Sequence, residues 1–144
     1  MSTDELERSL ERIHEVAQLA GIRGVVDREQ GMFRAEYQFD DGRELAVLVQ
    51  PTRMGEDGML AVTVSCPILQ FSEQKPIPDD MAMELLRRNE RMFYARYGIR
   101  DLEDASLVVA SVDHPLETLD AAELEVLMAS VIRAAGDLMQ ALGV

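Results

Sequence analysis

Three side chains in this sequence are of types that often carry out chemistry: one cysteine and two histidines. Cys66 precedes Pro67 at the end of an apolar segment, where a thiol usually acts as a small buried hydrophobic group. His14 has only carboxylates near it at helical spacing, which indicates a surface histidine and not a metal ligand. His114 stands where an apolar segment ends, as expected for a strand leading into a loop. We predict no catalytic residue, and a small hydrolase-like enzyme using His114 and nearby carboxylates stays an alternative.

Motifs that bind phosphates, dinucleotides or metals are absent from the sequence. The chain has no phosphate loop, no dinucleotide-binding glycine fingerprint, no zinc-ligand spacing and no nucleophile elbow. The glycines stand singly at positions where a turn is sufficient explanation. We therefore predict a protein that is not an enzyme and that needs neither a metal nor a cofactor.

Arginines provide the one basic cluster of the sequence. Its members are Arg87, Arg88, Arg91, Arg96 and Arg100. Guanidinium groups bind carboxylates and phosphates through paired hydrogen bonds, so the cluster suits an anionic ligand or an acidic segment of another protein. Local pairing with neighbouring acids such as Glu84, Glu90 and Asp101 is the simpler interpretation. Arg87 and Arg91 are candidate partner-binding residues, and a small-ligand sensor built on the arginines is a second alternative.

The net charge argues against two classes of partner. The 144 residues include 27 acidic and 14 basic side chains, which gives a formal charge of -13. A field of this sign repels nucleic-acid phosphates and anionic membranes, so we expect neither as a partner. No apolar run approaches the roughly 20 residues of a membrane span, and the acidic start Ser2–Glu5 is unlike a signal peptide. Together with the single cysteine, these features predict one cytoplasmic domain over residues 1–144.

Hydrophobic periodicity predicts three helices and five strands. Helices are expected over residues 2–20, 79–89 and 120–142, where apolar side chains recur at spacings of three and four. Strands are expected over residues 33–39, 45–49, 60–66 and 107–112. Met92 to Arg100 fits either a fifth strand or an extension of the second helix, and its aromatic content favours the strand.

This order, α-β-β-β-α-β-β-α, predicts an α+β fold in which one antiparallel sheet is packed by helices. Alternation along the strands assigns one apolar side of the sheet to the first and last helices. The residues expected on that side are Phe33, Tyr37, Val47, Val62 and Val109.

A second set of apolar residues points away from that side. Ala46 and Leu48 make the opposite side of the 45–49 strand apolar as well. Met32 is one of nine methionines, and flexible thioethers suit surfaces that accept varied apolar side chains. Met32, Ala46 and Leu48 are therefore candidate partner-binding residues.

With this order of elements, the chain resembles the type III secretion chaperone-like fold, whose members include CesT-type secretion chaperones and YbjN-like regulators of sensory transduction. The resemblance covers nearly the whole chain. It rests on Leu85-Leu86-Arg87-Arg88-Asn89, the aromatic segment after it, Asp101 to Asp104, Leu107-Val108-Val109, and Pro115 to Asp120 before the last helix. It implies a small acidic homodimer without enzymatic activity that binds another protein.

The dimer contact is expected at the second helix and the segment after it. Met83, Leu86 and Tyr94 do not all fit one sheet-facing stripe, so some of them need a cover from outside the domain. A second copy of the chain is the simplest cover, because twofold dimers are the commonest assemblies. The prediction is a homodimeric protein-binding module whose interface buries on the order of 1,200–2,000 Å².

Overall fold

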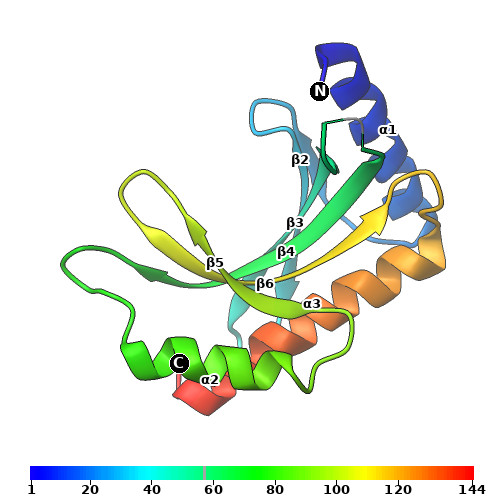
Figure 1. Ribbon diagram of the computed structural model, residues 1–144. Coiled ribbons are helices and arrows are strands. Elements are labelled where there is room, and N and C mark those ends of the chain that lie inside the picture. Colours follow the sequence, from blue (N-terminus) through cyan, green and yellow to red (C-terminus); the bar gives the residue numbers. More distant parts are fainter. Residues whose placement is uncertain (57) are drawn as a thin grey trace.

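The computed structural model describes residues 1–56 and 58–144 (Figure 1). Its elements follow in the order α1 (Thr3–Leu19), β1 (Val25–Asp27), β2 (Met32–Gln38), β3 (Glu44–Arg53), β4 (Leu60–Phe71), α2 (Asp79–Asn89), β5 (Arg96–Asp101), β6 (Ser106–Pro115) and α3 (Ala121–Leu142). The six strands form one open antiparallel sheet in the order β1-β2-β3-β4-β6-β5. The predicted α+β class is confirmed, with one strand more than expected.

The helices pack on one face of the sheet, around a core centred on β3, β4 and β6. Val49 lies opposite Val64, and Val64 lies opposite Val112, so these three side chains form a row on the helix-covered face. Ile13 of α1 and Val131 of α3 close over this face, and both are fully buried. The sheet is curved, with its hollow side turned away from α2 and α3 (Figure 1).

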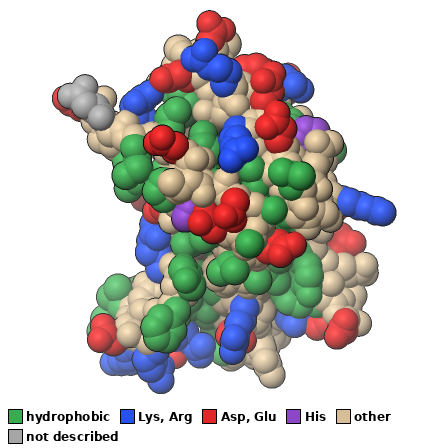
Figure 2. All heavy atoms as spheres, turned by 90° about the vertical axis from the view of Figure 1, so that its right-hand side faces the viewer, with side chains coloured by type: hydrophobic (Ala, Val, Ile, Leu, Met, Phe, Trp, Pro, Cys, Tyr) green, Lys and Arg blue, Asp and Glu red, His purple; other side chains and the backbone are tan. Residues whose placement is uncertain are grey.

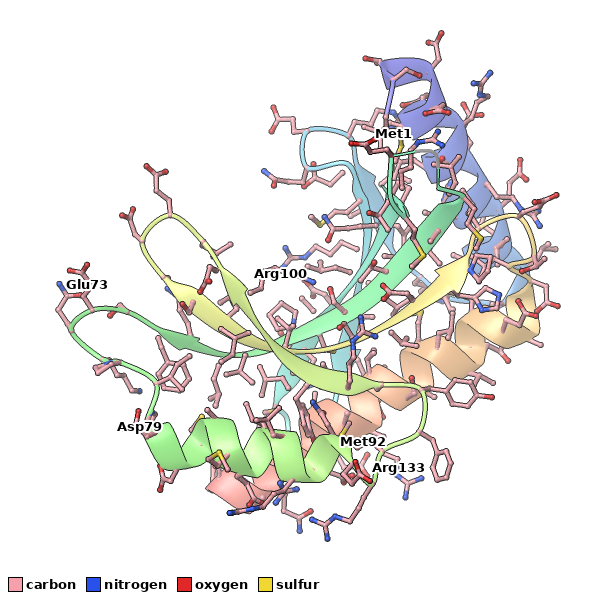
Figure 3. All side chains as sticks on the ribbon, in the orientation of Figure 1. Met1, Glu73, Asp79, Met92, Arg100 and Arg133 are labelled. Carbon is pink, nitrogen blue, oxygen red and sulfur yellow. The ribbon has the colours of Figure 1, made fainter. Side chains whose placement is uncertain are left out.

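The hollow side is a sheet face that no helix of the described residues covers, and we call it the bare face. Side chains alternate along each strand, so the residues between those of the core point here. Small side chains form its centre: Ala46, Ala61, Ser65, Gly98 and Ser111. Figure 3 places Arg100 on this hollow side of the sheet. One antiparallel face is therefore packed by helices, while the other has no helix over it and buries Ala61, Ser65 and Ser111 among its own side chains.

Side-chain caps fix where the two long helices begin. The Ser2 hydroxyl accepts a hydrogen bond from the Glu5 backbone N–H at 3.1 Å, and the Asp120 carboxylate accepts one from the Glu123 N–H at 2.8 Å. These bonds satisfy N–H groups that have no partner within the first helical turn. Gly143, at a φ of 70°, ends α3 in the left-handed conformation.

Two predicted elements differ in extent from those of the structure. The additional strand β1 pairs with β2, and its three residues are too few to show a periodic pattern. Of the ambiguous segment Met92 to Arg100, only the part from Arg96 onward is strand, in β5. The preceding residues, from Met92 to Ala95, form a turn. The preference for a strand over a longer helix was correct, but the strand begins four residues later than expected.

One of the five residues expected to face the helices does not. Phe33, Val47 and Val62 are fully buried on the helix-covered face, and Tyr37 lies on that face but stays 42% exposed. Val109 pairs with Pro67 and Gly98, which places it on the bare face. Because the 107–112 run is apolar on both sides, its alternation does not reveal which side faces the helices.

Candidate interaction surface

Helix α2 exposes two of its four large apolar side chains. Of its 11 residues only Leu85 is buried, where it joins the core. Met83 and Leu86, three positions apart and therefore on one side of the helix, are 51% and 64% exposed. In the turn that follows, Phe93 is 88% exposed and Tyr94 is 69% exposed. We call these four residues the α2–β5 surface.

An asparagine joins the end of α2 to the edge strand of the sheet. The Asn89 side-chain amide donates to the Tyr97 carbonyl oxygen at 3.0 Å, and its oxygen accepts from the Tyr97 backbone N–H at 2.8 Å. Strand β5 pairs only with β6, so these Tyr97 groups lie on the free edge of the sheet. Asn89 satisfies both of them and holds the turn between residues 89 and 97 at two points.

The turn itself has a strained backbone. Tyr94 has a φ of 62° and is the non-glycine residue with positive φ among the described residues. The Ala95 N–H donates to the Phe93 carbonyl oxygen at 2.8 Å, which closes a three-residue γ-turn with Tyr94 at its centre. A bulky residue in this conformation costs on the order of 1–3 kcal/mol, and such strain is concentrated at functional sites.

A second anchor joins β5 to α3. The Tyr97 hydroxyl donates to the Ala134 carbonyl oxygen at 2.6 Å, and the Tyr97 side chain is buried between the strand and the helix. Burial raises the pKa of the Tyr97 phenol, because the phenolate loses its hydration there. The phenol therefore stays protonated and keeps this hydrogen bond. The distance between the turn and α3 is set by this contact.

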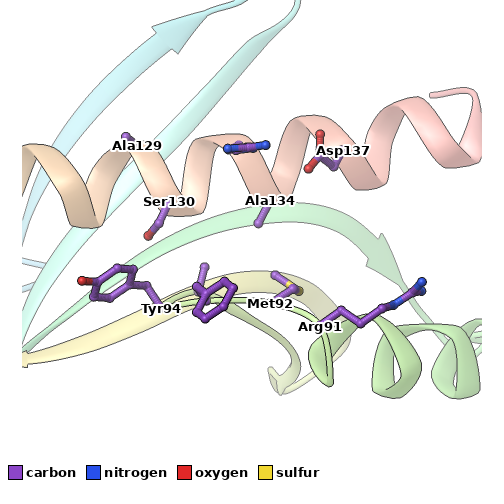
Figure 4. Close-up of a pocket in the computed structure, with 10 residues that line it drawn as sticks. Arg91, Met92, Tyr94, Ala129, Ser130, Ala134 and Asp137 are labelled. Atoms are coloured by element: carbon purple, nitrogen blue, oxygen red, sulfur yellow. The ribbon is translucent and has the colours of Figure 1, made fainter.

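A cleft of about 430 Å³ lies between α3 and the turn (Figure 4). The turn contributes the residues from Arg91 to Ala95, and α3 contributes Ala129, Ser130, Arg133, Ala134 and Asp137. Figure 4 shows Tyr94 and Arg91 on the side opposite the α3 residues. Met92 and Arg133 lie close together at this end of the molecule (Figure 3). The cleft combines a floor of alanines with aromatic and charged walls.

The local charge is opposite to that of the whole chain. Residues 83–100 include five arginines and two glutamates, a net charge of +3 (5 minus 2), within a chain of -13. Arg88 forms an ion pair with Glu84 at 3.0 Å. Arg87, Arg91 and Arg133 make no ion pair within 4.0 Å with another described residue. In the view of Figure 2, basic side chains gather at the lower end of the molecule beside apolar patches.

The structure separates the predicted interaction residues into two groups. Met83, Leu86, Tyr94 and Arg91 come together at α2 and its turn, and Arg87 is exposed on the same helix. Ala46 and Leu48 lie instead on the bare face, opposite Glu36 and Arg34 of β2, and Met32 begins β2 on that side.

The sequence reasoning missed Phe93, Arg133 and Asp137 as members of the site. Phe93 was assigned to an alternating strand, in which it would have faced the core. Two adjacent aromatic residues after a predicted helix end were the available signal for an exposed turn. Arg133 and Asp137 belong to a helix whose apolar stripe gives no information about its outer side.

The bare face carries one polar network. The Asp113 carboxylate accepts hydrogen bonds from the Thr63 hydroxyl and from the Arg96 guanidinium, each at 2.7 Å. Burial alone raises the pKa of Asp113, but the bonds from Thr63 and Arg96 and the charges of Arg96 and Arg100 together lower it. Ser65 lies nearby on the same face with a fully buried hydroxyl that has no hydrogen-bond partner among the described residues.

The cysteine and the two histidines lie elsewhere, and of these His114 is the residue of the enzyme alternative. Cys66 is buried on the helix-covered face, and burial raises the pKa of its thiol to about 12. His114 lies 2.7 Å from the Glu123 carboxylate at the start of α3. The His14 ring lies 6.2 Å from that of Phe33. These three side chains form no common site.

Outside residue 57, no group of three or more His, Cys, Asp and Glu side chains is placed to hold a metal ion. No helix of this part of the chain has the length and apolar character needed to cross a membrane. The sequence matches no protein-family model and no curated protein. The resemblance to the secretion chaperone-like fold stays a prediction.

Proposed function

We propose that this protein is a non-enzymatic binding module that works as a homodimer through its α2–β5 surface. The observation that carries the proposal is the exposure of four large apolar side chains on a helix with a single buried residue and on the turn after it. Burying one such side chain contributes roughly 1.5–3 kcal/mol. A surface of this kind is typical of a protein contact, and a second copy of the chain supplies a matching one.

The charge distribution supports a contact at this surface. Two copies that each carry -13 repel one another at long range. In a twofold contact through the α2–β5 surface, the two segments 83–100 lie against one another, and the acidic remainders of the two copies lie farther apart. Contact through this segment therefore keeps the acidic surfaces apart and reduces the repulsion.

We assign the bare face to the other protein that the dimer binds. Met32, Ala46 and Leu48 give it apolar side chains that are partly exposed, and these are the residues that another chain would contact. This face lies on the side of the sheet opposite the helices, so a dimer formed through α2 leaves it accessible. The homodimer and its partner then use different surfaces of one small domain.

A small-ligand sensor is the second candidate function, and one observation favours it. Arg91 and Arg133 line the same cleft, and neither is paired with an acid within 4.0 Å among the residues described. An anionic molecule that binds there loses affinity as salt rises, because salt screens its attraction to the guanidinium groups. Dimer formation between two acidic copies has the opposite dependence and tightens as salt rises.

The test of the dimer is a charge placed in the proposed contact. Leu86→Asp should give a folded monomer, because the exposed position tolerates aspartate within one chain while the contact does not. Sedimentation equilibrium measures the mass, and circular dichroism checks the fold. The matched control is Leu19→Asp, a leucine 78% exposed on α1, which should leave the dimer intact. A wild-type protein that is monomeric at micromolar concentration would contradict the proposed homodimer.

A further inference from the structure

We propose that Phe93 of each protomer inserts into the partner's cleft between α3 and the α2–β5 turn. This inference rests on the homodimer proposed above and names the contact at its centre. Phe93 is the most exposed large apolar side chain in the described part of the chain, and it stands at the mouth of the cleft. The same surface thus presents a projecting ring and a cavity beside it.

The turn holds the ring out before any partner binds. The Asn89 bonds to Tyr97 bracket the turn, and the Tyr97 bond to Ala134 fixes its distance from α3. Between these points, the γ-turn at Tyr94 leaves the backbone of Phe93 few other conformations. Because the turn is ordered in advance, little conformational entropy is lost when the ring is buried.

The cleft has the size and lining that an aromatic ring requires. Its volume of about 430 Å³ leaves room for a phenyl ring. The buried Ala134 and Ala95 form a small-residue floor, and the exposed Ala129 lies at the rim, so a ring can approach the backbone of α3. Arg133 and Tyr94 line the walls, and a guanidinium over a desolvated ring contributes on the order of 1–2 kcal/mol.

A second copy of the chain is the occupant that fits the geometry and charge together. A twofold contact requires one surface to carry both halves of each interaction, and here the ring and the cleft are neighbours. The rim is also self-complementary, because Asp137 lies in the same cleft as Arg91 and Arg133. Across a twofold axis, the aspartate of one protomer can meet an arginine of the other.

Removal of the ring and closure of the cleft should weaken the dimer independently. Phe93→Ala is expected to raise the dimer dissociation constant at least about 10-fold, the effect of a central aromatic anchor. Ala129→Trp, which places a large side chain at the rim of the cleft and leaves Phe93 in place, should have a similar effect. Leu19→Ala removes an exposed leucine from α1 and should change nothing. If wild-type protein dimerises and Phe93→Ala dimerises equally well, this inference is wrong while the homodimer stands.

A cross-link between two different variants shows which residues meet across the contact. Phe93→Cys protein is mixed with Ala129→Cys protein at a concentration well above the raised dissociation constant and treated with a short bifunctional thiol reagent, so any 93–129 link joins two chains. The native Cys66 does not compete, because it is buried and its pKa is raised to about 12. Mass spectrometry should find the 93–129 link well above the level for Leu19→Cys mixed with Ala129→Cys. If the 93–129 and 19–129 links form in equal yield in a protein that sediments as a dimer, the proposed insertion of Phe93 is wrong.

Discussion

Helices α3 and α2 differ in how much of their apolar surface the domain itself buries. Eight of the 22 residues of α3 are buried, and its apolar stripe closes the core from Leu124 to Met139. α2 has 11 residues and buries one, while Met83 and Leu86 stay exposed. The stability of α3 thus comes from its own domain, whereas α2 keeps an apolar side for which the domain offers no partner.

The difference separates residues that hold the fold from residues that form contacts with other molecules. A change in the stripe of α3 removes packing and should lower the free energy of unfolding. A change on the outer side of α2 should leave that free energy almost unaltered and act on association alone. The two helices can therefore be distinguished by measurements on single substitutions.

The largest expected effect is in α3. Leu138→Ala should lower the free energy of unfolding by about 2–5 kcal/mol, because Leu138 is buried and its truncation leaves a cavity. The matched change Leu86→Ala should alter it by less than about 0.5 kcal/mol in the monomer. Urea denaturation is measured for Leu138→Ala in the monomeric Leu86→Asp background, and for Leu86→Ala at a concentration low enough for the protein to be monomeric. Equal losses would contradict the comparison, since Leu86 would then be a core residue.

An intermediate effect is expected at the strained turn. Tyr94→Gly, in the monomeric Leu86→Asp background, should raise the free energy of unfolding by about 1 kcal/mol, because glycine adopts a φ of 62° without strain. Tyr94→Ala removes the same ring but keeps the β-carbon, and it should give no such gain. Urea denaturation of the three proteins checks this. A gain of the same size in both variants would place the effect in the ring and not in the backbone.

The smallest effect is expected on the bare face. The pKa of Asp113 is lowered in the folded protein, so its contribution to stability is full above the unfolded value of about 3.9 and is lost as pH falls below it. Asp113→Asn should therefore lose less stability than the wild type between neutral pH and about pH 3, by less than about 1 kcal/mol. The exposed Glu117→Gln serves as the control. Identical pH profiles for wild type and Asp113→Asn would show that the network with Arg96 and Thr63 contributes nothing.

Periodicity was sufficient for the parts of the fold in which one side of an element is buried. The α3 stripe and the alternation in β2 and β3 led to the observed elements, because a slip of one residue there exposes a whole apolar set. Val109 was placed on the wrong face because its strand is apolar on both sides. β1 was missed because its pairing with β2 is a tertiary contact that three residues do not encode locally.

The site was less accessible to sequence reasoning than the fold. Met83, Leu86 and Tyr94 were chosen because they did not fit a core stripe, and all three are exposed. Phe93 was not predicted as a site residue, because adjacent aromatic residues are compatible both with a strand and with an exposed turn. Arg91 and Arg133 line one cleft because Tyr97 contacts α3. This contact joins residues 37 positions apart in the chain, which the sequence pattern does not reveal.

Sedimentation equilibrium of the unmodified protein at micromolar concentration tests the central claim most directly. The account predicts a particle of twice the 16.1 kDa of one chain, and a dimer that tightens as salt is raised. In the same experiment, Leu86→Asp should sediment as a folded monomer and Leu19→Asp as a dimer. A wild-type mass of a single chain across this range of concentration and salt would contradict the assignment of the α2–β5 surface as a dimer contact.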